Sequence, residues 1–159
     1  MSLTEGMKAP AFQEQADYPG QWIVLYFYPK DDTPGCTREA CGFQDLSKLF
    51  HEHNAVILGV SRDDADSHQA FKTKYKLAFP LLSDPDLKLH KAYGAWGEKT
   101  SYGKTSMGVI RSTFLIDPQG NLAKIWPNVK VDGHVEQVLD AIKNAEGGTR
   151  TRTRVLGRF

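Results

Sequence analysis

The sequence predicts a single α/β domain in which helices flank a central mixed sheet. Three observations support this fold class: short apolar runs alternate with segments of helical period, a pair of strands joined by a turn follows them, and a last segment of helical period closes the domain. The chain of 159 residues is long enough for one substantial hydrophobic core. We expect the domain to span residues 1–146 and the basic segment 147–159 to be a disordered tail.

The predicted elements begin with a buried strand over residues 22–28. This run is apolar and aromatic and is too short for a buried helix. A helix over 37–52 follows, because apolar residues recur there at helical spacing, and a connecting helix makes the next strand parallel to the first. The remaining predicted elements are a strand at 55–60, a helix from 63 or 64 to 75, a strand at 79–82, a brief helix at 85–90, a glycine-rich irregular segment at 94–108, a hairpin of 110–116 with 121–126, and a helix at 133–145.

Charge and composition weigh against several classes of function. The net charge is +1, and four of the 20 basic residues are arginines in 147–159. The predicted domain is therefore mildly acidic, which argues against nucleic acid as a partner. No apolar run approaches the ~20 residues that span a membrane, and the N-terminus shows no secretory pattern. Two cysteines do not make a secreted disulfide framework, so we expect a protein of a reducing compartment, the cytoplasm.

Cys36 is the first candidate for chemistry, because it lies where a buried strand gives way to a helix. Pro29 ends the strand, turn-forming residues follow, and Cys36 falls in the first turn of the predicted helix. Unpaired N–H groups and the helix dipole favour a thiolate at that position. The alternative is a small buried core residue, the usual fate of a free cysteine. The polar loop favours a reactive sulfur, which we expect at the mouth of a pocket.

Cys41 lies five residues after Cys36. On an ideal helix this spacing is a rise of ~7.5 Å and leaves the two side chains ~140° apart. A disulfide needs Cα atoms within roughly 7 Å and Cβ vectors that converge. The two cysteines can therefore bond only if the first turns of the helix unwind, which Gly42 makes easier. A thioredoxin-type motif has two residues between its cysteines, and two cysteines alone do not build a zinc or iron–sulfur site.

Pro29, Thr33 and Cys36 form the pattern PxxxTxxC, followed directly by TREAC. The further segments of interest are FPLLSD at 79–84, YGAWGEK at 93–99, GVIRSTFLIDPQG at 108–120 and the helix after VDGH at 131–134. Together they closely resemble the peroxiredoxins, specifically the PrxQ or bacterioferritin co-migratory protein subfamily, in the same order over residues 6–146. The resemblance implies a thioredoxin-like fold and a thiol-dependent peroxidase that reduces hydrogen peroxide and small organic hydroperoxides.

The resemblance also implies roles for the two cysteines, as in an atypical 2-Cys peroxiredoxin. Cys36 would attack the peroxide as a thiolate and become a sulfenic acid, and Cys41 would condense with it to an intrachain disulfide. Thioredoxin or a similar dithiol would restore both thiols by exchange. An intrachain resolving cysteine needs no partner subunit, which favours a monomer. No metal or other cofactor is expected, because the five histidines form no metal motif.

Four further residues match the family pattern, and each has a plainer alternative. Arg111 would hold the thiolate and the peroxide through its fork of donors, or form a surface salt bridge. Thr33 would bond the substrate oxygen, or only cap a helix, and Pro29 would screen the sulfur from water, or only end a strand. Glu39 would position the arginine, or be a favourable acid in a first helical turn. The N–H group of Gly35 is a candidate oxyanion donor, together with that of the catalytic cysteine.

Two other functions would use parts of the same pattern. A redox sensor would form the same disulfide with little turnover. A thioredoxin-fold chaperone or binding module without catalysis would need none of these residues. The joint presence of Thr33, Cys36 and Arg111 argues against the second possibility.

Overall fold

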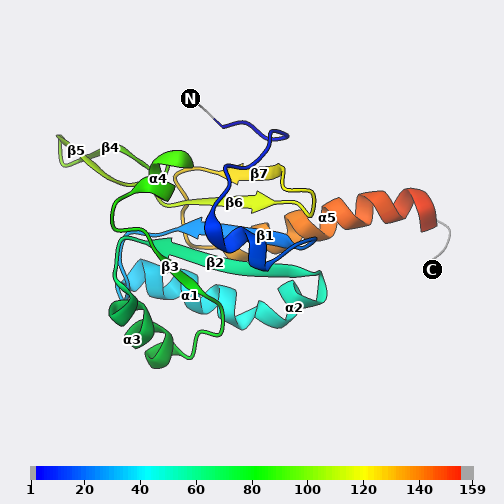
Figure 1. Ribbon diagram of the computed structural model, residues 1–159, viewed down its shortest axis with the longest axis horizontal. Coiled ribbons are helices and arrows are strands. Elements are labelled where there is room, and N and C mark those ends of the chain that lie inside the picture. Colours follow the sequence, from blue (N-terminus) through cyan, green and yellow to red (C-terminus); the bar gives the residue numbers. More distant parts are fainter. Residues whose placement is uncertain (1–2, 155–159) are drawn as a thin grey trace.

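The computed structural model describes residues 3–154 and has a central five-stranded sheet of order β3-β2-β1-β6-β7 (Figure 1). β1, β2 and β3 run parallel, whereas β6 is antiparallel to β1 and β7 to β6. This arrangement confirms the predicted mixed sheet. A second, two-stranded sheet consists of β4 and β5. The strands are β1 (Trp22–Phe27), β2 (Ala55–Ser61), β3 (Leu81–Ser83), β4 (Trp96–Ser101), β5 (Lys104–Val109), β6 (Ser112–Ile116) and β7 (Leu122–Trp126).

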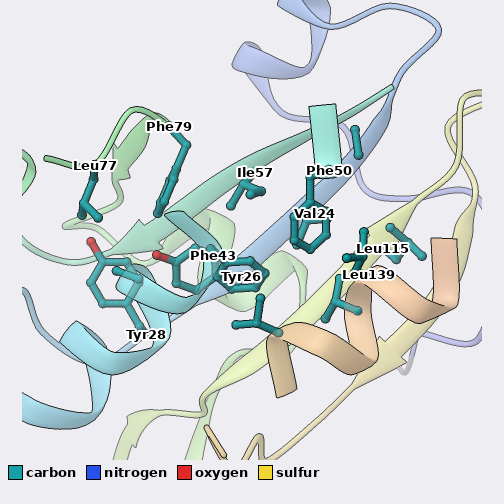
Figure 2. Packing of buried hydrophobic residues seen from close by; sticks show 14 of the residues in the cluster. Val24, Tyr26, Tyr28, Phe43, Phe50, Ile57, Leu77, Phe79, Leu115 and Leu139 are labelled. Atoms are coloured by element: carbon teal, nitrogen blue, oxygen red, sulfur yellow. The ribbon is translucent and has the colours of Figure 1, made fainter. Parts of the chain in front are cut away.

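The central strand β1 is buried on both faces, and its alternating side chains enter two hydrophobic clusters. Val24 and Tyr26 belong to the larger cluster (Figure 2), to which α1, α2, α3 and α5 contribute side chains. Leu25 and Phe27 belong to the opposite cluster, beneath the segment around α4 and the N-terminal residues. The sheet is therefore the middle of three layers. The helices are the 3-10 helix η1 (Gln13–Asp17), α1 (Pro34–Asp45), α2 (Ser47–Glu52), α3 (Ala65–Tyr75), α4 (Lys88–Ala92) and α5 (His134–Arg154).

The helix predicted over 37–52 is in fact two helices. α1 ends at Asp45 and α2 begins at Ser47, because Leu46 between them leaves the helical conformation with φ −101° and ψ 8°. Phe43 and Phe50 on either side are both fully buried. The apolar period thus continues across the break, and for this reason it does not reveal the break.

The segment 94–108 was predicted to be irregular, and this prediction was wrong. β4 and β5 pair in antiparallel register around Tyr102 and Gly103, which have positive φ values of 52° and 77°. The hairpin projects away from the central sheet (Figure 1), and residues 102–107 are all exposed. A hairpin that buries neither face of its tip has no apolar alternation by which its strands could be recognised.

The last helix is longer than predicted, since α5 continues past residue 145 to Arg154. Its backbone includes residues 147–154 of the segment that we expected to be disordered, and 155–159 lie outside the described residues. Each glycine of the pair at 147–148 lowers helix propensity by about 1 kcal/mol but keeps its N–H group, so the pair does not end the helix as a proline would. Within residues 3–154, no helix is both long and apolar enough to cross a bilayer.

Candidate active site

The turn between β1 and α1 places Cys36 in the first turn of α1, as predicted. Thr33 is extended, with φ −95° and ψ 156°, and its carbonyl accepts the N–H group of Thr37 at 2.8 Å. Pro34 opens the helix at a position where a missing N–H group costs little. Cys36 itself is only 1% exposed. The expectation of an open sulfur at the mouth of a pocket is therefore wrong for this conformation.

The burial of Cys36 follows from its spacing along α1. Cys36, Ala40 and Phe43 lie at positions i, i+4 and i+7, and all three belong to the cluster that packs against β1. The face of the helix that carries the sulfur is thus also its core-facing side. The sulfur is nevertheless not surrounded by apolar groups alone, because one charged side chain reaches it.

Arg111 brings a guanidinium to the sulfur from the start of β6. β6 begins at Ser112 instead of residue 110, and the Arg111 carbonyl accepts the N–H group of Val129 at 2.8 Å, so Arg111 lies just outside the strand. Its Nη2 lies 3.3 Å from Cys36 Sγ, and its Nη1 donates to Glu39 Oε1 at 2.6 Å. One guanidinium thus binds two groups of α1, which the forked geometry of arginine permits.

Gly35 makes room for this arrangement. A Cβ atom at position 35 would lie 3.3 Å from Arg111 Nη2, closer than most side-chain contacts allow. Any larger residue would therefore press on the guanidinium at the point where it meets the sulfur. The structure thus gives Gly35 a steric part in the site, in addition to its predicted role as a backbone donor.

Glu39 is completely buried beneath Arg111. Burial raises the pKa of the Glu39 carboxyl to about 7, although the charge and the hydrogen bond of Arg111 act in the opposite direction. Among the described residues, neither Glu39 Oε2 nor the buried Tyr26 hydroxyl has a hydrogen-bond partner. Only one oxygen of the Glu39 carboxyl is therefore hydrogen-bonded. With a pKa of about 7, this carboxyl can gain or lose its proton near neutral pH.

Thr33 and Pro29 belong to the loop before α1, and neither side chain forms a hydrogen bond with the sulfur. The Thr33 hydroxyl donates to the Lys30 carbonyl at 2.9 Å and makes no capping bond to the helix. Pro29 is half-buried two residues after the end of β1. In this conformation Thr33 therefore closes the turn that carries the cysteine.

Cys41 is partly buried on the same helix, and both cysteines are free thiols. Burial raises the pKa of the Cys41 thiol, and the nearby charge of Asp45 adds to the effect. The intact helix is consistent with the spacing argument that these two side chains cannot bond unless α1 unwinds.

Sequence reasoning missed the polar groups that hold the loop. Asp31 is buried, and its carboxylate lies 2.7 Å from Nδ1 of the equally buried His68 of α3. A signal for this cluster was present in the sequence. Asp31 and Asp63, which contacts it, each follow one of two adjacent parallel strands, and the carboxyl ends of parallel strands lie at one edge of a sheet.

The histidines lie apart and in different surroundings. His68, His90 and His134 are buried at separate positions, whereas His53 contacts Glu146 of α5 at 2.5 Å. In the part of the chain that the structure describes, no three potential metal-binding side chains come together. The candidate chemistry therefore centres on the cysteine and the arginine.

The fold and this pair of residues define a class of protein. A mixed sheet with helices on both faces, a cysteine in the first turn after the central strand and an arginine on its sulfur are the features of a peroxiredoxin, a thiol-dependent peroxidase. A profile of the AhpC/TSA family matches residues 8–125, and the chain belongs to this family.

Individual relatives agree with this assignment. The chain is 47% identical to the putative peroxiredoxin bcp of Coxiella burnetii over 148 residues, which cover 87% of this chain and 98% of the relative. It is also 47% identical to the peroxiredoxin Bcp of Bacillus subtilis over 153 residues, covering 91% and 98%. The structure of the Xanthomonas campestris bacterioferritin comigratory protein is similar with a TM-score of 0.78, at 47% identity over 82% of this chain and 83% of that one. These comparisons confirm the predicted subfamily and the thioredoxin-like fold.

Proposed function

We propose that Cys36 is the peroxidatic cysteine and that it reduces hydrogen peroxide and small organic hydroperoxides. The thiolate attacks one peroxide oxygen, the O–O bond breaks, and the products are a Cys36 sulfenic acid and, after proton uptake, water or an alcohol. The contact of Arg111 Nη2 with Cys36 Sγ supports this most directly. A guanidinium beside the sulfur stabilises the thiolate before the reaction and the negative charge that develops on the leaving oxygen during it.

The other matched residues support these two groups in the proposed site. Glu39 holds the guanidinium of Arg111 through the buried ion pair. The N–H groups at the start of α1, including that of Gly35, are directed to the leaving oxygen, because the first N–H groups of a helix have no partner within it. Thr33 and Pro29 shape the loop and bound the space that the peroxide enters. Because Cys36 is 1% exposed, we infer that the loop or the arginine moves outward to admit substrate.

The proposed cycle continues with Cys41 as the resolving cysteine. The first turns of α1 unwind, the Cys41 thiol condenses with the Cys36 sulfenic acid, and water leaves as the disulfide forms. Thioredoxin or a similar dithiol then reduces this bond by exchange. Such a cycle needs a compartment with a supply of dithiol, and we assign it to the cytoplasm.

The choice of peroxides rests on one of the similar structures. The Xanthomonas campestris protein has been studied in complexes with a trapped intermediate and a ligand that concern its alkyl peroxide reduction activity. We extend this substrate class, together with hydrogen peroxide, to the present chain.

Peroxide consumption by the wild type, Cys36→Ser and Cys41→Ser, each with thioredoxin and with alternative reductants, tests the proposal. We expect no turnover in Cys36→Ser. We expect a single oxidation but little thioredoxin-supported turnover in Cys41→Ser. Mass spectrometry of the oxidised wild type should show an internal Cys36–Cys41 bond.

Each contrary result has a distinct meaning. Unchanged consumption in Cys36→Ser would remove the peroxidatic role of this residue. A lasting sulfenic acid beside a free Cys41 would remove the resolving role of Cys41. Oxidation of the wild type without turnover under any reductant would favour a redox sensor.

A further inference from the structure

The loop between β1 and α1 is fastened to α3 through one buried carboxylate. Asp31 accepts hydrogen bonds from the Tyr28 hydroxyl at 2.5 Å, from Ser67 Oγ at 2.8 Å and from His68 Nδ1 at 2.7 Å. Its own N–H group donates to Asp63 Oδ2 at 2.7 Å. The carboxylate and the histidine are both nearly inaccessible, with side chains 4% and 5% exposed. The Asp31 carboxylate, in the middle of the loop between β1 and α1, thus accepts three hydrogen bonds.

His68 has an acceptor at each ring nitrogen. Nδ1 faces the Asp31 carboxylate, and Nε2 lies 3.0 Å from the Leu82 carbonyl of β3. A carbonyl and an ionised carboxylate can only accept, so both contacts are hydrogen bonds only when the ring carries a proton on each nitrogen. The geometry therefore requires a positively charged imidazolium that links the loop, α3 and β3.

We propose that Asp31 and His68 form an ionic clamp that holds the Cys36 loop in its closed position, and that the clamp opens when α1 unwinds to let Cys41 reach the sulfur. Both are positioning residues, since no contact joins either one to the sulfur. The proposal deepens the proposed function and rests on it, because the unwinding step belongs to that cycle.

The position of Asp31 in the chain explains why the clamp would act on α1. Asp31 lies two residues before Thr33, the N-cap whose carbonyl accepts the first helical N–H bond. When the first turns of α1 melt, the backbone on both sides of Thr33 must move. An anchor two residues away resists that movement.

A second attachment of the same loop contributes less. Asp32, the next residue, is bound by Lys74 Nζ at 2.8 Å and by the Tyr75 hydroxyl at 2.7 Å. Its ion pair with Lys74 is solvent-exposed on both sides, with side chains 40% and 58% exposed. Exposed pairs contribute little, whereas opening a buried pair leaves charges without partners. We therefore assign the main resistance to Asp31 and His68.

The charges around the clamp make it dependent on pH. The groups that face His68 are Asp31 from the loop, Asp63 from the segment after β2, and the neutral Leu82 carbonyl from β3. Burial disfavours the imidazolium, but the hydrogen bond and charge of Asp31 outweigh it and raise the pKa of His68. Burial likewise opposes the ionised form of Asp31, and the bonds from His68, Tyr28 and Ser67 outweigh it and lower the pKa of Asp31.

The two groups stabilise the clamp in different ranges of pH. His68 contributes fully below its ordinary pKa of 6.5, and its contribution is lost as the pH rises through the raised value. Asp31 contributes above its ordinary pKa of 3.8, and its contribution is lost as the pH falls through the lowered value. The clamp is therefore tightest in mildly acidic solution and loosens as the solution becomes alkaline.

Hydrogen exchange of the reduced protein tests the clamp without any peroxide. His68→Gln keeps a donor but cannot become charged, and His51→Gln on the exposed surface of α2 is the matched control. At pH 6, amides of residues 30–37 should exchange about tenfold faster, or more, in His68→Gln than in the control, the scale of a lost hydrogen bond to a charged group. After correction for intrinsic exchange, the exchange rates of these amides in the wild type should rise between pH 6 and 9, because the loop opens more often. In His68→Gln the corrected rates should not depend on pH.

A second measurement follows the chemistry. After one equivalent of peroxide, the Cys36–Cys41 bond should form about tenfold faster in His68→Gln than in the control, because the same opening precedes it. If His68→Gln does not fold, Ser67→Ala removes one donor to Asp31 and should raise exchange of the loop in the same direction. Exchange at 30–37 that is unchanged in the folded variant, or that does not vary with pH in the wild type, overturns the clamp. A wild type that consumes no peroxide overturns the proposed function instead and leaves the exchange result to decide on the clamp.

Discussion

At the scale of single residues, the guanidinium of Arg111 is the group on which the site depends. It contacts the sulfur of Cys36 and the buried carboxylate of Glu39 at once. A lysine in its place would keep the charge but would bring one nitrogen in place of the two that contact the two partners here. The shape of the side chain, and not its charge alone, is therefore what we expect the reaction to require.

Arg111→Lys should lower kcat/KM for hydrogen peroxide by about 100-fold, the loss typical when one donor to a developing negative charge is removed. Stopped-flow measurement of peroxide consumption checks this value. Arg38→Lys is the control, because Arg38 lies on α1 and its ion pair with Asp132 is exposed. Equal rates in the wild type and Arg111→Lys would show that the fork is not needed.

Glu39 should make the stability of the protein depend on pH. Its folded pKa of about 7 lies above the ordinary 4.5, so folding favours the protonated form. The contribution of Glu39 to the free energy of unfolding is fully present below pH 4.5, falls as the pH rises, and is lost above about pH 7. Between pH 4.5 and 7, the free energy of unfolding of the wild type should therefore fall by up to about 3 kcal/mol because of Glu39, since each pKa unit corresponds to about 1.4 kcal/mol.

Urea unfolding at a series of pH values measures this dependence, and the difference between the wild type and Glu39→Gln isolates it from other titrating groups. His134 has the opposite slope, because burial lowers its pKa to about 4 and its contribution is lost as the pH falls. Glu52→Gln, a change at an exposed carboxyl, should follow the wild type. A difference curve for Glu39→Gln that stays flat between pH 4.5 and 7 would contradict the raised pKa.

At the scale of elements, α1 carries both cysteines and would have two conflicting tasks in the proposed cycle. Packed and intact, it holds Cys36 against Arg111. Unwound, it would let Cys41 reach the sulfur. Gly42 lies directly after Cys41 and close to α5, since a Cβ atom there would approach Val135 Cγ2 to 3.1 Å. The glycine thus lets two helices pack closely and also lowers the helix propensity of α1 beside Cys41, where the proposed cycle needs it to unwind.

Oxidation should therefore reduce the helix content of the protein. With one equivalent of peroxide, the circular dichroism signal at 222 nm should decrease by the amount expected for about seven residues, two helical turns. Addition of a dithiol should restore the signal. Cys41→Ser, which cannot form the bond, should keep its signal throughout. A wild-type spectrum that does not change while the disulfide forms would exclude unwinding of α1 as the route.

At the scale of the whole molecule, the two cysteines to which we assign oxidation and resolution lie in one chain. The large apolar side chains that the described residues expose are scattered, with Leu49 on α2 and Tyr102 and Met107 on the β4–β5 hairpin. Such isolated residues do not make a continuous interface. Cys36, Cys41 and Arg111, the groups that the proposed cycle uses, all lie in a single chain.

We expect a monomer in both redox states. Size-exclusion chromatography with light scattering should give 17.8 kDa for the reduced and for the oxidised protein. Turnover per chain should not change when the protein is diluted. A disulfide-linked dimer on a non-reducing gel after peroxide treatment would contradict the intrachain route.

Features that depend on neighbouring residues could be predicted from the sequence. The period of apolar residues marked β1, β2, α3 and the buried face of α5, and the turn before Cys36 marked the start of α1. The period of apolar residues could not reveal the break at Leu46, because burial continues across it. It could not reveal the β4–β5 hairpin either, because the residues at the tip of that hairpin are exposed on both faces. The predicted end of α5 was wrong because glycines weaken a helix without removing its backbone donors.

The sequence by itself determined that this protein is a mixed α/β domain with a cysteine at a helix start and a second one that an intact helix keeps out of reach. Only the tertiary structure brings distant groups to that helix and its loop. Arg111 lies 75 residues from Cys36 along the chain, and its place beside the sulfur was expected from the family resemblance and not from local patterns. His68 lies 37 residues from Asp31, and this contact was not expected at all. Contacts of this kind depend on how strands pair and helices pack, and local period and spacing carry no information about either.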